Sequence, residues 1–257
     1  MKFKEKVVLI TGADSALGRA CAEFFGSEGA LLALVGQNEK EFVGLLKRIK
    51  VLCIQNKPHI ILANFAIESE RIMGETIDTY GHLDILINGS GTVIIGTITD
   101  LNMDDYDMVM LSNLRGVIEM TKQAIPHLIK TKGNIINVSS ICSDRQFGGF
   151  LAYSVSKAAL DQFTKCAAIE LASKQIRVNS INPGFIMADF MQLTSGYRFG
   201  DEYIVPDPES ETVTAEVKHI EKCLNTIAFF ATDHTHSYVS GAILPVIYDG
   251  VVNVVTV

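Results

Sequence analysis

The stretch Asn137–Ala158, NVSSICSDRQFGGFLAYSVSKA, sets the order in which a strand, a loop and a helix follow one another. The run Ile135–Val138 is largely apolar and predicts a buried strand, and Ser140 follows where the carboxyl end of that strand would lie. Tyr153 comes thirteen residues later, and Lys157 four residues after Tyr153. On a helix, this i,i+4 spacing puts the tyrosine ring and the lysine ammonium on one face, one turn apart.

A tyrosine one helical turn from a lysine can act as an acid and a base, because the lysine lowers the pKa of the phenol. Free tyrosine has a pKa of roughly 10, which is too high for proton transfer near neutral pH. An adjacent cation favours the phenolate and lowers that pKa. The hydroxyl of Ser140 can then hold an oxygen of the reacting group. A Tyr-x-x-x-Lys pentad or a serine at a strand end is common by itself, so the prediction depends on all three residues together.

Composition limits the class of protein. The chain has 257 residues, of which 48% are hydrophobic and 20% charged, so one α/β domain can bury a sizeable core. A net charge of -7, with no basic cluster larger than that within Lys47–Lys50, argues against nucleic-acid binding. The five cysteines are scattered and form no C-x-x-C pair, which predicts reduced thiols and no metal site. No apolar run approaches about 18 residues, so we expect a cytoplasmic protein without a membrane span.

Stretches typical of strands and of helices alternate along the whole chain. The expected strands are residues 7–10, 31–35, 60–63, 83–87, 135–138, 177–181 and 242–246. The expected helices are one that follows Gly18 and ends at Gly29, then 39–50, 68–80, 102–128 with a kink near Pro126, 153–174 and 217–231. The alternation predicts one domain, 1–257, built on a doubly wound parallel sheet of the Rossmann type, with helices on both faces and ligands at the carboxyl ends of the strands. Residues 188–215 have no clear period and are expected to form a substrate lid.

The order of a strand, Ser140, a loop of about a dozen residues, Tyr153-x-x-x-Lys157 and a helix resembles the active site of the short-chain dehydrogenase/reductase superfamily, in its form of about 250 residues. The resemblance covers essentially the whole chain. It implies reversible hydride transfer between a nicotinamide cofactor and an alcohol or a carbonyl. Ser140 would hydrogen-bond the carbonyl oxygen, Tyr153 would donate the proton, and Lys157 would tune Tyr153 and hold the nicotinamide ribose. Asn113, 27 residues before Ser140, matches the fourth catalytic residue and would position a water that links Lys157 to solvent.

Three further segments resemble cofactor-binding segments of this family. Thr11–Gly18, TGADSALG, is similar to T-G-x-x-x-G-x-G, with Ala16 at the middle glycine, and it lies where a helix N-terminus can bind phosphate. Asn88–Gly91, NGSG, stands where the family has N-N-A-G, and Asn182–Gly184 matches N-P-G, with Ala188 in place of a later threonine. The resemblance implies these cofactor contacts: Gly12, Ser15, Leu17, Gly18, Gln37, Asn64 (an aspartate in the family), Phe65, Asn88, Tyr153, Lys157, Pro183, Gly184 and Ile186.

The choice between NAD and NADP depends on the residues that end the second strand. An acidic residue there binds the 2′-hydroxyl of the adenosine ribose and indicates NAD. This chain has Gly36-Gln37-Asn38, so we expect no carboxylate to repel a 2′-phosphate. The arginine often found near Gln37 in NADP-using relatives is missing as well. We favour NADP(H), with Gln37 as a hydrogen-bond donor, and NAD(H) stays open.

The sequence says less about the substrate. PHLIKTKGNIINVSS followed by AYSVSKAALDQF resembles the 3-oxoacyl carrier-protein reductase-like branch of the family. The same site serves many carbonyl compounds, so the label alone does not identify a substrate. Aromatic and apolar residues near the site and in the expected lid favour a hydrophobic carbonyl of the steroid, xenobiotic or 3-oxoacyl type: Phe147, Phe150, Phe185, Phe190, Met191, Tyr197 and Tyr203.

Relatives usually form dimers or tetramers, and the apolar ending 251–257 would be a costly exposed edge in a monomer. We therefore expect a homo-oligomer, foremost a tetramer. Two other readings of the function stay open. One is an NAD-dependent alcohol dehydrogenase of the same family. The other is a catalytically idle nucleotide-binding scaffold, which the departures from the family pattern at Ala16, Gly89, Ser90 and Ala188 would favour.

Overall fold

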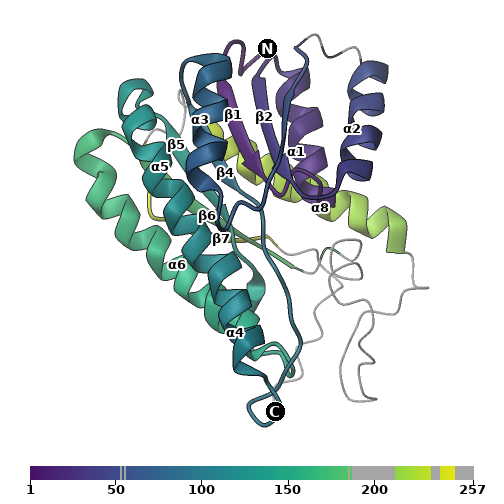
Figure 1. Cartoon of the computed structure of the whole chain (residues 1–257), viewed down its shortest axis with the longest axis vertical. Coiled ribbons are helices and arrows are strands. Elements are labelled where there is room, and N and C mark those ends of the chain that lie inside the picture. Colours follow the sequence, from purple (N-terminus) through teal and green to yellow (C-terminus); the bar gives the residue numbers. More distant parts are fainter. Residues whose placement is uncertain (53, 55, 185, 187–211, 233–237, 247–257) are drawn as a thin grey trace.

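The fold is built on a parallel sheet (Figure 1). The computed structural model describes residues 1–52, 54, 56–184, 186, 212–232 and 238–246. In this part of the chain seven strands pair in parallel in the order β3-β2-β1-β4-β5-β6-β7. They are β1 (Val7–Thr11), β2 (Leu31–Gly36), β3 (His59–Leu62), β4 (Ile85–Asn88), β5 (Asn134–Val138), β6 (Arg177–Pro183) and β7 (Ile243–Val246). The doubly wound sheet expected from the sequence is confirmed.

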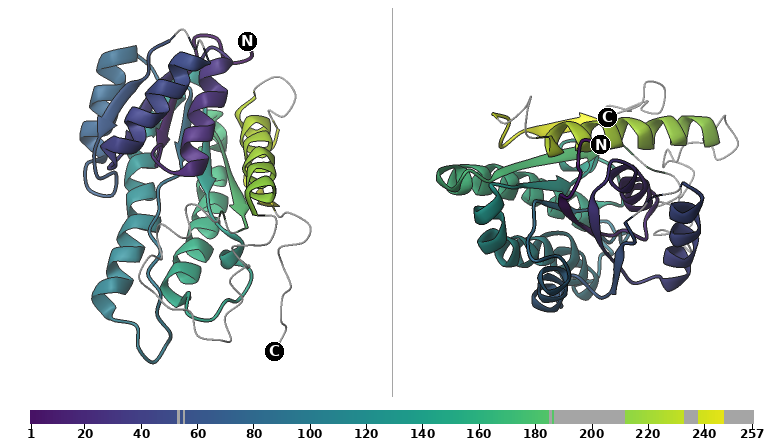
Figure 2. Two further views of the ribbon diagram at one scale, coloured as in Figure 1. Left: turned by 90° about the vertical axis from the view of Figure 1, so that its right-hand side faces the viewer. Right: turned by 90° about the horizontal axis from the view of Figure 1, so that it is seen from above.

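Helices cover both faces of the sheet (Figures 1 and 2). The helices are α1 (Ala16–Ser27), α2 (Glu39–Val51), α3 (Ser69–Tyr80), α4 (Met103–Met110), α5 (Gly116–Thr131), α6 (Leu151–Leu171) and α8 (Thr212–Ala231). One layer of the core joins alternate strand residues to α1, α2 and α8, and the other joins the remaining strand residues to α3, α5 and α6. Because both faces are covered, β1 and β6 are buried along their whole length. This accounts for the continuous apolar run of β1.

Short polar side chains begin three of the helices. Ser15 accepts a hydrogen bond from the N–H of Gly18 in α1, Asn38 from Lys40 in α2, and Asn102 from Asp104 in α4. Each such cap satisfies a backbone donor that lacks a partner within its helix and stabilises the helix by about 1 kcal/mol. Two of these caps, Ser15 and Asn38, follow the ends of β1 and β2 and so help to fix the loops at the sheet edge where ligands bind in this type of fold.

The segment expected as one helix over 102–128 is divided. A π-helical turn, Leu111–Arg115, separates α4 from α5, and Pro126 lies inside α5, which continues to Thr131. The change of helix type therefore lies at Asn113, not at Pro126. Single π turns within helices occur frequently at functional sites, because the extra residue changes where the side chains point.

Most of the expected lid lies outside the described residues. This applies to 188–211, including Phe190, Met191, Tyr197 and Tyr203, and also to Phe185 and the apolar ending 251–257. The last four residues assigned to the lid, 212–215, belong to α8, which begins five residues earlier than expected.

Candidate active site

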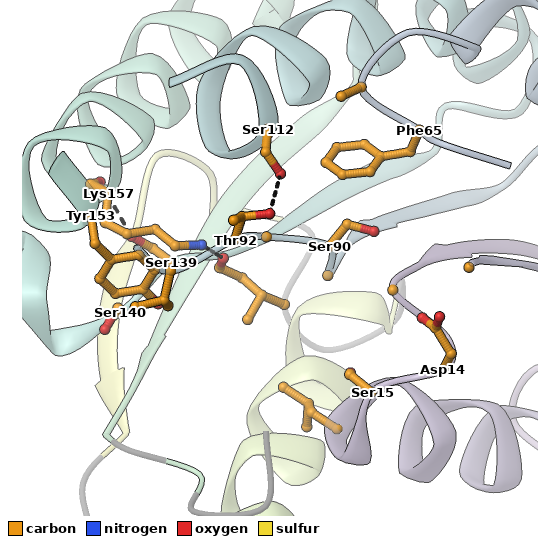
Figure 3. Close-up of a pocket in the computed structure, with 18 of the residues that line it drawn as sticks. Asp14, Ser15, Phe65, Ser90, Thr92, Ser112, Ser139, Ser140, Tyr153 and Lys157 are labelled. Carbon is orange, nitrogen blue, oxygen red and sulfur yellow. Dashed lines mark hydrogen bonds between the residues drawn. The ribbon is translucent and has the colours of Figure 1, made fainter. Parts of the chain in front are cut away.

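A cavity of about 520 Å³ opens at the carboxyl ends of the strands (Figure 3). It lies beside the neighbouring strands β1 and β4, from which the chain continues towards opposite edges of the sheet. A crevice at this switch point is the general ligand site of doubly wound sheets. Most of the predicted cofactor and catalytic residues line it: Gly12, Ser15, Leu17, Gln37, Asn64, Phe65, Ser140, Tyr153, Lys157, Pro183, Gly184 and Ile186. Three of the predicted residues do not line the cavity and instead pack behind it: Gly18, Asn88 and Asn113.

The glycine-rich loop is closely packed against the turn after β4. Gly12 has a φ of +68°, and a methyl group on it would lie 2.8 Å from the backbone of Gly89. A methyl group on Gly18 would collide with the carbonyl oxygen of Gly12. Glycine at these positions therefore lets α1 begin directly at the cavity. Ala16 packs against the core and does not line the cavity, so its methyl group leaves the approach to the loop open.

The turn after β4 departs from the family pattern for a steric reason. A methyl group on Gly89 would lie 2.7 Å from the carbonyl oxygen of Thr11, so the asparagine usual in the family has no room here. The hydroxyl of Thr11 accepts hydrogen bonds from the N–H groups of Gly89, at 3.1 Å, and Ser90, at 3.3 Å. These bonds tie the turn to β1.

Asn88 is a buried sheet residue that does not line the cavity. Its Nδ2 donates to Oδ1 of Asn137 at 2.9 Å, and Nδ2 of Asn137 donates to the hydroxyl of Thr164 at 2.8 Å. Asn88 and Asn137 are paired residues of the adjacent strands β4 and β5. These two hydrogen bonds join β4, β5 and α6 behind the cavity.

Asn113 is fully buried in the π-helical turn. Its Nδ2 donates to the carbonyl oxygen of Thr92 and to the hydroxyl of Ser156, and its Oδ1 accepts from the N–H of Thr92 at 2.7 Å. The side chain thus joins the loop after β4 to α6. Oδ1 also borders the space beside Gly91, where a methyl group would lie 3.2 Å from it and 3.5 Å from Nζ of Lys157.

Tyr153 and Lys157 lie on α6 at one end of the cavity (Figure 3). Nζ of Lys157 is 5.6 Å from the centre of the Tyr153 ring and donates to the carbonyl oxygen of Val138 at 2.8 Å. Burial lowers the pKa of Lys157 from 10.5 to about 8, and the carboxylate of Asp161 and the thiol of Cys142 partly offset this effect. The ammonium is therefore a desolvated charge that is still largely protonated at pH 7.

Ser140 lies two residues beyond β5 and begins a short 3-10 turn, Ile141–Ser143. Its hydroxyl oxygen accepts a hydrogen bond from the N–H of Cys142 at 3.2 Å. Because this bond uses a lone pair, the hydroxyl proton remains available to an oxygen in the cavity. Ser140, Tyr153 and Lys157 thus come together at the same end of the cavity, as expected from their spacing (Figure 3).

Apolar groups surround this catalytic end. The rings of Phe150 and Tyr153 pack edge to face with centres 6.4 Å apart, and Val93 and Phe147 belong to the same cluster. The loop after β4 and the loop before α6 are joined by a hydrogen bond from the N–H of Gly96 to the carbonyl oxygen of Gly149, at 2.8 Å. Met108 and Leu111 extend the apolar lining.

The opposite end of the cavity contains a carboxylate that sequence reasoning missed (Figure 3). Oδ2 of Asp14 accepts hydrogen bonds from the N–H groups of Gln37 and Asn38, at 2.8 and 2.9 Å. A methyl group on Gly36 would lie 2.5 Å from Cγ of Asp14. The argument that no acid faces the end of β2 is therefore wrong, because the acid comes from the glycine-rich loop. The only signal in the sequence was an acidic residue within the otherwise small or apolar segment GADSALG.

Two classes of feature are absent from the described residues. No group of three or more histidine, cysteine, aspartate or glutamate side chains there could hold a metal ion. None of the helices in that part of the chain is long and apolar enough to cross a membrane.

Comparison with known proteins places this site in a family. A family profile described as short chain dehydrogenase matches residues 6–196. The 3-oxoacyl-[acyl-carrier-protein] reductase of Thermotoga maritima is 29% identical over 250 residues, which cover 95% of this chain and 97% of that protein. The apo-form of glucose dehydrogenase of Caenorhabditis elegans superposes with a TM-score of 0.78 and 32% identity, over 96% of this chain and 98% of that one. A short-chain dehydrogenase/reductase of unknown function from the same organism, solved with cofactor, superposes with a TM-score of 0.85 and 31% identity, over 96% and 95% of the two chains. The chain belongs to the short-chain dehydrogenases, oxidoreductases that bind a nicotinamide cofactor and act on alcohol or carbonyl groups of small molecules.

Proposed function

We propose that this protein catalyses reversible hydride transfer between a nicotinamide dinucleotide and a hydrophobic carbonyl compound or the corresponding secondary alcohol. The observation that carries the proposal is the cavity itself. Ser140, Tyr153 and Lys157 line one end of it, and the glycine-rich loop at the start of α1 lines the other. A dinucleotide that spans the cavity would reach both ends.

The cavity suits such a cofactor. Ser15 and Leu17 bring the positive N-terminal end of α1 to it, which favours the pyrophosphate. Asn64 and Phe65 line the part that would hold the adenine, and Pro183, Gly184 and Ile186 line the part that would hold the nicotinamide amide. When bound, the nicotinamide ring supplies the hydride to the substrate carbon or accepts it from that carbon.

In the reducing direction each catalytic side chain has a distinct role. The hydroxyl of Ser140 donates a hydrogen bond to the substrate oxygen, and Tyr153 transfers its phenolic proton to that oxygen. The ammonium of Lys157, 5.6 Å from the tyrosine ring, stabilises the negative charge that develops on the phenolic oxygen. Asn113 holds the loop after β4 against α6 and borders the space beside Lys157 through which the proton is restored. The alcohol is oxidised by the same steps in reverse.

The lining supports a hydrophobic substrate. Val93, Met108, Leu111 and Phe150 line the cavity along with Tyr153. Thr92 and Ser112 are hydrogen-bonded to each other at 3.2 Å, which leaves them less able to bind the many hydroxyls of a sugar. We therefore expect ketones with aromatic or aliphatic substituents to have a higher kcat/KM than sugars, which a substrate panel would measure.

For the dinucleotide, two observations point in opposite directions. The side chain of Gln37 is exposed at the cavity and can donate to a 2′-phosphate, as expected for NADP(H). The carboxylate of Asp14 lies beside the same strand end and favours NAD(H). Titration of the protein with both cofactors would decide between them.

The test of the catalytic proposal is Tyr153→Phe, with Tyr238→Phe as the control, because Tyr238 is 97% exposed and does not line the cavity. Tyr153→Phe should abolish turnover of any substrate that the panel finds and leave dinucleotide affinity within about twofold of the wild type. The control should leave both turnover and dinucleotide affinity unchanged. Comparable turnover in the Tyr153→Phe variant would remove this residue from the mechanism. A wild type that binds dinucleotide but turns over no carbonyl would favour the idle scaffold.

We also propose a homo-oligomer, foremost a tetramer, in the cytoplasm. Large apolar side chains are exposed on two neighbouring helices: Met103 and Met108 on α4, and Val155 and Ile169 on α6. Burial of such groups favours association. The described cysteines Cys21, Cys142, Cys166 and Cys223 are free thiols, which suits a reducing compartment. Light scattering at micromolar concentration and cell fractionation would test these two proposals; a monomer would contradict the first.

A further inference from the structure

We propose that Asp14 determines the dinucleotide preference of this enzyme: its carboxylate binds the adenosine ribose in place of an acidic residue at the end of β2, so that NAD(H) is preferred to NADP(H). This inference rests on the proposed function and concerns the adenosine end of the same cavity. It differs from the preference for NADP(H) that the strand end alone indicated.

The position of the carboxylate is the first argument. In dinucleotide folds the ribose is bound by an acid whose side chain starts from the end of the second strand. Here that position is Gly36, and the space its side chain would fill is taken by Asp14: a methyl group on Gly36 would lie 2.5 Å from both Cγ and Oδ1 of Asp14. The carboxylate of Asp14 thus lies where the carboxylate of an acidic residue 36 would lie, and the glycine at residue 36 leaves space for it. Asp14, Gly36 and Gln37 all line the cavity.

The hydrogen bonds of Asp14 are the second argument. Oδ2 already accepts from the N–H groups of Gln37 and Asn38, and these bonds hold the side chain in position. Among the described residues, Oδ1 accepts no hydrogen bond and can accept one from the 2′-hydroxyl of a ribose. The same two N–H groups would otherwise be donors for a 2′-phosphate. Asp14 therefore repels the phosphate and also occupies backbone donors that could have bound it.

The nearby cations do not offset this charge. Arg19 donates to the carbonyl oxygen of Asp14, and its guanidinium pairs with the carboxylate of Glu41 at 2.6 Å. Neither Arg19 nor Lys40 lines the cavity. Gln37, the residue at the usual place of a phosphate-binding arginine, is neutral. A phosphate of charge about -1.5 to -2 would thus meet an aspartate that has no partner arginine among the described residues of the cavity.

The experiment measures the affinities of NADH and NADPH by calorimetry on four proteins: the wild type, Asp14→Asn, Asp14→Ser and Asp78→Asn. Asp78 is exposed on α3 and outside the cavity, so the last variant removes the same charge elsewhere. Asn keeps an acceptor for the strand-end N–H groups, whereas Ser is too short to reach them. The two variants together separate the effect of charge from an effect on the loop, and thermal unfolding checks that each is folded.

We expect the wild type to bind NADH at least tenfold more tightly than NADPH. Both Asp14 variants should lower that ratio about tenfold, which corresponds to about 1.4 kcal/mol, mainly by tighter binding of NADPH, and Asp78→Asn should leave it unchanged. Tighter binding of NADPH by the wild type would overturn the inference, as would an unchanged ratio in folded Asp14 variants. Failure of the wild type to bind either dinucleotide would instead refute the proposed function.

Discussion

Lys157→Met should abolish turnover and at the same time stabilise the fold. The ammonium is needed to stabilise the phenolate of Tyr153, but its burial destabilises the native state. Lys157 is 3% exposed, and its pKa is lowered from 10.5 to about 8. At about 1.4 kcal/mol per pKa unit, this difference means that the charged form destabilises the native state by roughly 3 kcal/mol relative to the neutral form. Methionine has a similar volume and no charge. The variant loses the hydrogen bond to Val138, worth about 1 kcal/mol, so a net gain of roughly 2 kcal/mol at pH 7 is expected.

The sign of the pH dependence follows from the direction of the shift. Below pH 8 the lysine is protonated in both states, and the full destabilisation is present. Between pH 8 and 10.5 only the unfolded state holds the proton, so the stability of the wild type rises with pH relative to the variant. Urea unfolding of both proteins at several pH values would measure the difference, which should be largest below pH 8 and should shrink as the pH rises to 10.5. Lys165→Met, on the exposed face of α6, serves as the control. A variant that is less stable than the wild type at pH 7, or a difference that does not change with pH, would refute this reasoning.

Further predictions concern the groups around Lys157 and the tight turns. Asp161→Asn should lower the pKa of Lys157, since the Asp161 carboxylate raises it. The alkaline limb of the pH–rate profile of carbonyl reduction should therefore move to lower pH. Glu170→Gln, on the exposed face of the same helix, should leave that limb in place. Gly91→Ala would place a methyl group 3.2 Å from Oδ1 of Asn113 and 3.5 Å from Nζ of Lys157, so kcat should fall roughly tenfold with little change in unfolding. Gly44→Ala, in α2 with open space around it, should leave kcat unchanged and stabilise the protein by about 0.5–1 kcal/mol in urea unfolding. Gly18→Ala should destabilise the fold by about 1–3 kcal/mol and weaken dinucleotide binding in calorimetry, because the methyl group collides with the Gly12 carbonyl.

The sequence predicts best what depends on local pattern. All seven described strands begin and end within two residues of their expected bounds. Most of them are the continuous apolar runs that are typical of strands covered on both faces. The i,i+4 spacing likewise placed Tyr153 and Lys157 on one face of α6. Ser140 follows β5, so its side chain reaches the cavity edge as expected.

Features that depend on contacts between distant segments could not be predicted from local sequence patterns. Asn88 has the residue type of a ligand-binding group, but its pairing with Asn137 on β5 makes it part of a buried network. The π-helical turn at Asn113 has no signature in the helical period. Asp14 lies 22 residues before Gly36 in sequence, and only the folded loop brings its carboxylate to the strand end.

The departures from the family pattern acquire different meanings once the structure is known. Gly89 has no space for a side chain beside Thr11, and Ala16 packs into the core, so neither position disturbs Ser140, Tyr153 or Lys157. These two departures therefore give no support to an idle scaffold. Asp14, at a variable position of the glycine-rich motif, and Gln37 lie where the adenosine ribose would bind, at the other end of the cavity from the proton donor. On the proposed function, Asp14 and Gln37 thus act on the choice of dinucleotide, while Ser140, Tyr153 and Lys157 keep their places at the other end of the cavity.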